Sequence, residues 1–194
     1  MQLAKPILAG LILLALLVLW IAYGVYVSMS VPEARYEVLE TLENDVEIRA
    51  YPGEVWATNV AADQNKAFGP LFKYISGDNN KSEKIEMTAP VVIMKTEKGQ
   101  FMAFVMPERF DINSIPMPSS SDVKIELIKA RKLAAIRFSN YVTQENYEKH
   151  QALLTKTLES HGISMIGKPL LMQYNDPWTP PFMRRNEVAI QVDQ

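Results

Sequence analysis

The stretch VEIRAYPGEVWATNVA, from Val46 to Ala61, contains the unit from which the fold can be predicted. Residue types that β-strands favour lie on both sides of Pro52-Gly53, a pair that is typical of turns. We therefore expect two strands, over Asp45–Tyr51 and Val55–Ala61, with a further strand before them over Tyr36–Leu42.

A helix is predicted directly after these strands. Asp63 can cap its start and Gly77 can end it. Four apolar side chains between them follow the i, i+3, i+4, i+7 spacing of a helix with one apolar face: Phe68, Leu71, Phe72 and Ile75. Two more strands are expected after this helix, over Lys84–Met94 and Gln100–Met106, with a turn at residues 97–99 between them.

The same order of elements recurs after a connection rich in Pro and Ser at residues 107–121. The expected elements are strands over Val123–Ile128 and Leu133–Phe138, a helix from Thr143 to His161, and strands over Leu170–Tyr174 and Glu187–Val192. An offset of 77 residues relates Val46-Glu47-Ile48 to Val123-Lys124-Ile125 and Ala57 to Ala134. Because antiparallel strands in this number usually close or pack to hide their edges, we predict an α+β fold. It would be an eight-stranded antiparallel β-barrel with two flanking helices and a pseudo-two-fold β-β-α-β-β repeat.

The N-terminal segment predicts where this domain lies. Ile7–Val27 is a run of 21 residues without a charge, and a helix of that length, at about 1.5 Å per residue, crosses a hydrocarbon core of about 30 Å. Lys5 precedes the run, whereas acidic residues outnumber Arg35 just after it, which places the N-terminus in the cytoplasm. We expect a transmembrane anchor over residues 1–30 and an extracytoplasmic domain over residues 31–194, in a single-pass protein of the cell membrane. A cleaved signal peptide ending near Ser28-Met29-Ser30 is the alternative.

Composition excludes several functional classes. The chain has 20 basic and 22 acidic residues among 194, so it lacks the basic excess that nucleic-acid binding needs. It has no cysteine, which excludes disulfides, a thiolate nucleophile and thiolate-bound zinc. The two histidines, His150 and His161, are about 16 Å apart along the second predicted helix, so they cannot share one iron, and we expect structural roles for both. Four methionines could offer thioether sulfur or simply fill the core: Met87, Met102, Met106 and Met172.

Several motifs of the sequence are distinctive in combination: AFGPLFKYISG at residues 67–77, MTAPV at 87–91, YNDPWTPP at 174–181 and RRNEV at 184–188. Together they resemble the SOUL family of heme-binding proteins. The resemblance covers about Tyr36 to Val192 and implies a distorted eight-stranded antiparallel barrel flanked by two helices. It also implies non-covalent binding of heme or another tetrapyrrole in a shallow apolar groove beside the first helix of the domain.

The resemblance implies a set of cofactor-binding residues on that helix. Phe68, Leu71, Phe72 and Ile75 would lie against the porphyrin ring, and Lys73 would meet a carboxylate of the ligand. The same pattern is also that of a helix that simply faces its own core. Thr179-Pro180-Pro181 stands where a porphyrin-binding member of the family carries a lysine, so one propionate contact is missing. The identity of an axial iron ligand, and whether any metal is bound, is unknown at this stage.

Two other functions stay open. The SOUL fold resembles GyrI-like domains, which bind cationic or aromatic small molecules and in some members hydrolyse them, and Glu187 could be the carboxylate of such a site. Its pKa would be raised if it faced an apolar cleft, or it would be clamped by Arg184 or Arg185. The third possibility is a structural envelope protein without a ligand.

No catalytic constellation is recognisable, so we do not predict an enzyme. Ser121-Asp122-Val123-Lys124 fits S-x-x-K, but it straddles a predicted loop and a strand, whereas that motif works with both residues on one helix. We expect a monomer, because each predicted strand finds a partner within the chain.

Overall fold

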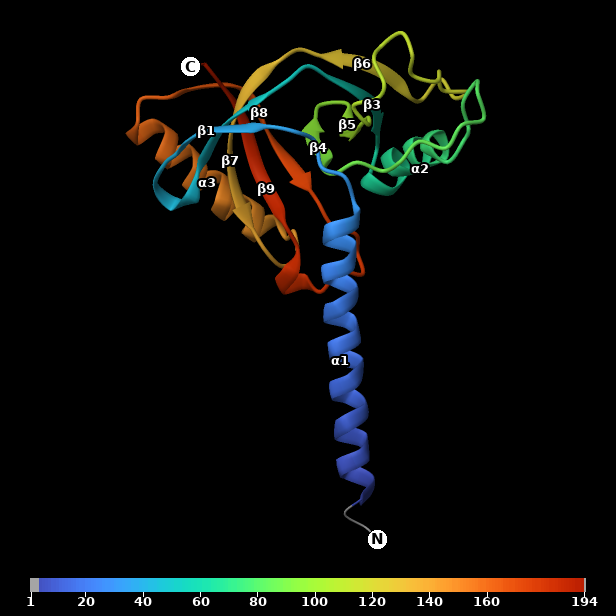
Figure 1. The fold of residues 1–194 in the computed structure, drawn as a ribbon. Helices are drawn as coiled ribbons and strands as arrows, with labels where there is room; N and C mark the ends of the chain where they lie inside the picture. The colour runs from blue at the N-terminus through green and yellow to red at the C-terminus, as the bar shows by residue number, and fades with distance from the viewer. Residues whose placement is uncertain (1–3, 194) are drawn as a thin grey trace.

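The computed structural model describes residues 4–193 and consists of a long N-terminal helix followed by a domain built on one antiparallel sheet (Figure 1). The helices are α1 (Ala4–Ser30), α2 (Gln64–Ile75) and α3 (Gln144–Ser160), with short 3₁₀ turns η1 (Glu43–Asp45) and η2 (Pro181–Met183). The strands are β1 (Glu37–Thr41), β2 (Glu47–Tyr51), β3 (Glu54–Ala61), β4 (Val91–Thr96), β5 (Gly99–Val105), β6 (Lys124–Ile128), β7 (Arg131–Phe138), β8 (Ser164–Gln173) and β9 (Asn186–Asp193). The predicted anchor and domain also include residues 1–3 and 194, which lie outside the described residues.

The sheet is open, which corrects the prediction of an eight-stranded barrel. Its strand order is β1-β2-β7-β9-β8-β4-β5-β3-β6, and within residues 4–193 no ladder joins β1 to β6. The prediction assumed that the edges must be hidden by closure. Instead, β1 is exposed along its whole length and carries Glu37 and Glu40, while β6 carries Lys124 and Glu126. Charged side chains on an edge strand discourage pairing with another chain, so the sheet does not need to close.

The strand order has an internal symmetry. When β1 is left out, the order of the other eight strands has a two-fold symmetry. If β2, β3, β4 and β5 are exchanged with β6, β7, β8 and β9 respectively and the direction is reversed, the same order results. Each set of four strands also encloses one helix, α2 or α3, at the same place in the chain. The common origin of the two halves stays a prediction.

Two predicted strands differ from the observed ones. Residues 84–90 are irregular, and β4 begins only at Val91, because Pro90 has no N–H to contribute to a ladder. The chain there pairs instead with the segment after α1, where the Ala34 N–H donates to the Ala89 carbonyl at 2.7 Å. β8 starts at Ser164, six residues earlier than expected. The strand continues through Gly167, which has a positive φ of 77°, because its pairing with β9 shifts register between Ile166 and Leu170.

Helix α2 forms where it was predicted and packs against β3 and β5. Its N-cap is Asp63, whose carboxylate accepts a bond of 2.9 Å from the Lys66 N–H. Leu71 and Tyr74 are fully buried and join the main core. Its residues Gln64, Asn65 and Phe68 line a cavity together with Val27 of α1, which is described below.

Helix α1 projects away from the sheet (Figure 1). Its stretch Ile7–Ser30 is long and apolar enough to cross a membrane, a property that an anchor and a signal sequence share. The C-terminal part of the helix touches the loop between β8 and β9. There the Trp20 Nε1–H donates to the Trp178 carbonyl at 2.7 Å and the Asn175 amide donates to Ser28 Oγ at 3.0 Å.

Candidate functional site

An apolar cavity of about 500 Å³ lies where the end of α1, the start of α2, strand β4 and the loop after β8 meet. We call it the helix-side cavity. Its apolar wall is formed mainly by Val27, Val31, Phe68, Met87, Val91 and Met102. Pockets that take small molecules and cofactors have volumes of about 300–1,000 Å³ and are mostly apolar, so this cavity is of the right size and character for an organic ligand.

Few charged groups line the helix-side cavity. Arg184 is the one cation and Asp176 the one carboxylate among its described lining residues. Asp176 is engaged locally, because its Oδ1 accepts the N–H groups of Trp178 and Thr179 at 2.6 and 2.9 Å. The half-buried Arg184 guanidinium donates through Nε and Nη2 to the carbonyls of Thr179 and Pro177, which fixes its plane at the cavity wall. This arrangement provides a rigid cation beside an apolar space.

The predicted binding residues on α2 divide into two groups. Leu71 and Ile75 are buried in the core, so their side chains do not reach a surface ligand. Phe68 and Phe72 are 38% and 51% exposed, and their rings stack with centroids 5.6 Å apart. Phe68 lines the helix-side cavity, whereas Phe72 and Lys73 are exposed and lie outside its lining. The surface that α2 offers to a ligand is thus the pair Phe68 and Phe72.

Both histidines bond to their own helix. His150 Nδ1 lies 2.7 Å from the Asn146 carbonyl and its ring stacks on Phe138, while His161 Nδ1 lies 3.0 Å from the Thr157 carbonyl. Neither lines the helix-side cavity. Of the four methionines considered, Met87 and Met102 do line it. The part of the chain that the structure describes contains no group of three His, Cys, Asp or Glu side chains that could hold a metal ion.

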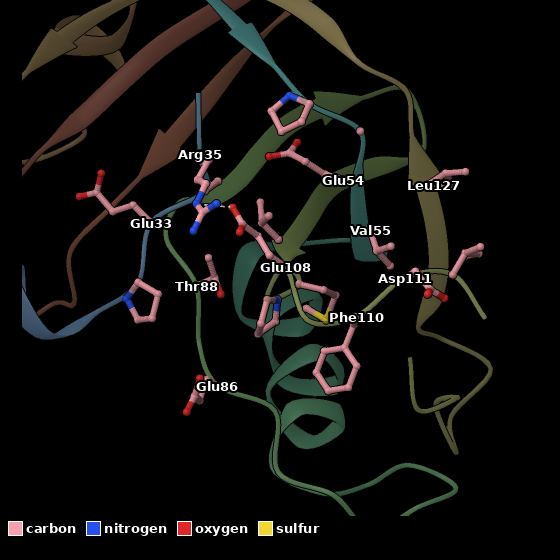
Figure 2. A pocket seen from close by; sticks show the side chains of 18 residues that line it. Glu33, Arg35, Glu54, Val55, Glu86, Thr88, Glu108, Phe110, Asp111 and Leu127 are labelled. Atoms are coloured by element: carbon pink, nitrogen blue, oxygen red, sulfur yellow. Dashed lines mark ion pairs between the residues drawn. The ribbon is translucent and has the colours of Figure 1, made fainter. Parts of the chain in front are cut away.

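A second cavity, of about 810 Å³, opens on the other side of residues 86–88 and is surrounded by carboxylates (Figure 2). We call it the acidic cavity. Its carboxylates are Glu33, Glu54, Glu86, Glu108 and Asp111. Figure 2 shows Arg35 and Glu108 facing each other, and Arg35 Nε lies 2.8 Å from Glu108 Oε1. Asp111 accepts the N–H groups of Asn113 and Ser114, which lowers the pKa of its carboxyl and keeps it charged.

Thr88 lies between the two cavities and lines both of them. Its hydroxyl oxygen is buried and has no hydrogen-bond partner among the described residues. A buried polar group without a partner is costly, so Thr88 is available to a ligand in either cavity.

Glu187 does not face a cleft. It is fully buried and accepts bonds from Arg49 at 2.6 and 3.0 Å, from Arg185 at 2.8 Å and from the Tyr174 hydroxyl at 3.0 Å. Burial alone would raise the pKa of Glu187, but the two guanidinium groups outweigh it and hold that pKa below its usual value. The possibility of a raised pKa is therefore wrong. The clamp includes Arg185 and Arg49, whereas Arg184 points elsewhere.

Comparison with known proteins now identifies the family. A family model described as SOUL heme-binding protein matches residues 31–191. The chain belongs to the SOUL heme-binding protein family. It is 30% identical over 155 residues to heme-binding protein 1 of Mus musculus, which covers 73% of this chain and 81% of the relative. It is also 30% identical over 125 residues to heme-binding protein 1 of Xenopus laevis, covering 61% and 65% respectively.

Solved structures share the fold of this SOUL domain at low sequence identity. The C-terminal domain of EcmrR matches with a TM-score of 0.59 and 10% identity, covering 82% of this chain and 98% of that one. A hydrolase from Listeria innocua matches with a TM-score of 0.51 and 11% identity, covering 85% and 95%. At such identities the likeness concerns the fold and not the chemistry.

Sequence reasoning missed three parts of the SOUL-domain site. Val27 belongs to the segment interpreted as an anchor and Val31 is the first residue of the predicted domain, yet together they form a wall of the helix-side cavity. Arg184 was considered only as a partner for Glu187. Arg49, which pairs with Glu187, lies 138 residues away from it. The motifs MTAPV and YNDPWTPP could have indicated the cavity, because Met87, Thr88 and residues 174–177 all line it.

Proposed function

We propose that this SOUL-family chain binds heme or a related tetrapyrrole, non-covalently, in the helix-side cavity. The observation that carries the proposal is the apolar cavity itself, with the Phe68–Phe72 stack at α2 and Arg184 as its cation. The family and the relatives named heme-binding protein 1 support heme as the ligand. α1 would anchor the domain on the outer side of the cell membrane, with the N-terminus in the cytoplasm.

Residues in the cavity wall and on the adjacent surface of α2 suit a tetrapyrrole, with Phe68 in the wall and Phe72 and Lys73 outside it. A flat ring gains contact area and favourable geometry against aromatic side chains, which Phe68 and Phe72 offer. Arg184 can pair with a propionate through its guanidinium, and Lys73 on the exposed side of α2 can meet the other propionate. Leu71 and Ile75 hold the helix to the core instead of meeting the ligand. The acidic cavity is a poor site for this ligand, because its carboxylates would repel the propionates.

Bound heme would supply an iron that can take axial ligands. Met87 and Met102 are the thioether groups in the cavity wall, and we assign neither as a ligand. The role of the protein residues is to bury the ring, exclude water from its face and hold the carboxylates at the rim.

An absorbance titration with hemin and with iron-free protoporphyrin tests the proposal. At about 25 cal/mol per Å², losing about 60 Å² of ring contact in Phe68→Ala costs about 1.5 kcal/mol, or about tenfold in affinity. Phe110→Ala, which removes the same side chain from the acidic cavity, is the matched control and should leave the affinity unchanged. A loss of affinity in Phe110→Ala but not in Phe68→Ala would show that the site is wrong.

Two further comparisons characterise the site. Lys73→Ala should weaken binding by less than about 1 kcal/mol, and the effect should fade in high salt, because the side chain is exposed. Substitution of His150 or His161 should leave the Soret band unchanged. Equal affinity for hemin and protoporphyrin would mean that the iron has no axial protein ligand.

A second candidate function is favoured by the acidic cavity. Four of its five carboxylates pair with arginines, whereas Asp111 accepts backbone N–H groups and keeps a charge that a cationic aromatic ligand could meet. Titration with a cationic dye tests it, with Asp111→Asn as the variant that should weaken binding. Glu187 is not positioned for hydrolysis, because it is buried and fully paired. If the folded chain binds neither hemin nor the dye, a structural role in the cell envelope is the function that remains.

A further inference from the structure

The loop between β8 and β9, Asn175–Arg184, lies against α1 within the apolar stretch of that helix (Figure 1). The Trp20 indole donates to the Trp178 carbonyl, and a Cβ added at Gly24 would lie only 2.7 Å from Pro180 Cδ. Trp20 is ten positions before Ser30, the last residue of α1, which corresponds to about 15 Å along a helix. The loop therefore reaches well below the end of α1 and into the segment that would lie in the bilayer.

The carbonyl groups of loop residues 177–181 already have donors. Those of Pro177 and Thr179 accept from Arg184, that of Trp178 from Trp20, that of Pro180 from the Met183 N–H and that of Pro181 from the Asn140 and Arg184 N–H groups. Backbone that enters an apolar medium must satisfy its polar groups internally, and irregular backbone rarely does so. These five consecutive carbonyls meet that condition.

The N–H groups of residues 177–181 are also accounted for. Pro177, Pro180 and Pro181 have none, and those of Trp178 and Thr179 donate to the Asp176 carboxylate. Proline at three of five positions removes donors that would otherwise need water. Loop residues 177–181 thus need no water for the backbone groups named here.

The side chains at the tip of the loop are large, apolar and exposed. Trp178 is 75% exposed and Phe182 is 56% exposed. On the adjacent helix Trp20, Tyr23 and Tyr26 are also exposed. Trp and Tyr favour the level of the lipid headgroups, so the loop and the helix together form one aromatic surface of the kind found at membrane interfaces.

We propose that the β8–β9 loop is a second membrane contact, which inserts Trp178 and Phe182 into the phospholipid leaflet next to the domain. The proposal rests on the anchoring role proposed for α1 and does not depend on which ligand is bound. It holds the domain in one orientation on the bilayer. Since Val27, Val31 and residues 175–177 line the helix-side cavity, that orientation places the cavity at the bilayer surface, where an apolar ligand can be exchanged with the lipid.

Single cysteines test this contact directly, because the chain has no native cysteine. The full chain is reconstituted into phosphatidylcholine vesicles as Trp178→Cys, Phe182→Cys, Leu127→Cys or Leu14→Cys, each labelled with an environment-sensitive fluorophore. Leu127, on edge strand β6, is 60% exposed and serves as the matched control, and Leu14 in α1 reports insertion of the helix. Quenching is measured with iodide in the water and with doxyl groups on the lipid.

The labels at Trp178 and Phe182 should be quenched several-fold more by lipid doxyl than the label at Leu127, and several-fold less by iodide. In one outcome, lipid doxyl quenches the label at Leu14, and iodide quenches the labels at Trp178 and Phe182 as strongly as the label at Leu127. This result would overturn the loop contact but not the anchor. Absence of lipid quenching at Leu14 would overturn the anchor and the loop contact together. Labels at Trp178 and Phe182 that neither quencher reaches would indicate a protein partner and would also overturn the proposal.

Discussion

Replacing Glu187 by glutamine perturbs the buried ionic cluster that joins β2 to β9. The substitution keeps the shape of the side chain but removes the charge that Arg49 and Arg185 share. Arg49 is only 3% exposed, so water cannot replace the lost partner. Breaking a buried ion pair by removing one partner costs about 3–5 kcal/mol. We expect a value near the lower limit, because Glu47 still contacts Arg49 and Glu33 still contacts Arg185.

The effect of Glu187→Gln should depend on pH in a defined direction. In the folded protein the pKa of Glu187 is lowered below its usual 4.5, so the unfolded chain takes up a proton first as the pH falls. The stabilisation is therefore fully present above pH 4.5 and is lost as the pH falls through the folded pKa. The difference in the free energy of unfolding between wild type and variant should be constant from neutral pH to about 4.5 and should shrink below it.

The measurement is urea unfolding of the full chain in non-ionic detergent, followed by near-ultraviolet circular dichroism, in which Trp56 reports the packing of the sheet. Glu86→Gln is the control, because Glu86 pairs with Arg109 at the surface and such pairs contribute about 0–1 kcal/mol. A Glu187→Gln variant within about 1 kcal/mol of wild type would refute this account of the cluster. The account would also be refuted if the difference in the free energy of unfolding between wild type and Glu187→Gln did not shrink below pH 4.5.

Three other outcomes are expected. Leu71→Ala should lower the free energy of unfolding in urea by about 2–5 kcal/mol, and the folded variant should bind hemin as wild type does. Phe72→Ala should do the opposite, weakening hemin binding with little loss of stability. Removal of residues 1–30 should leave a domain that sediments as a monomer and unfolds in one cooperative transition; an aggregated or gradually melting product would contradict this. A reporter fused after Gln194 should be active only outside the cytoplasm, and activity inside would reverse the predicted topology.

The elements of the fold could be predicted where local signals were strong. The helix after Asp63 and the strand Leu133–Phe138 are where the residue pattern indicated, since capping and β-propensity are local properties. The barrel was not predictable in this way, because closure depends on whether the two outermost strands meet. That is decided by the twist of the whole sheet and by the charges on β1 and β6.

Long-range pairing explains what was missed in the buried cluster. Arg49 lies between Ile48 and Ala50 on a strand with mostly apolar neighbours, and no local feature indicates its partner. Only the strand order β2-β7-β9 brings it to Glu187, with one strand between them. The sequence left open a raised pKa in a cleft or a clamp by Arg184 or Arg185; of these the Arg185 clamp is found, and the partner on β2 was not predicted.

The division of the apolar side chains on α2 follows from the helical period and bears directly on the proposed site. Successive residues turn by about 100°, so Phe68, Leu71, Phe72 and Ile75 span an arc of about 100°. The buried face also includes Ala67 and Tyr74, which the prediction did not place there. Both lie on the Leu71 side of the arc, so the centre of the buried face is shifted away from Phe68 and Phe72. These two phenylalanines occupy the boundary between core and solvent, where stability does not require aromatic side chains and a ring-shaped ligand can reach them.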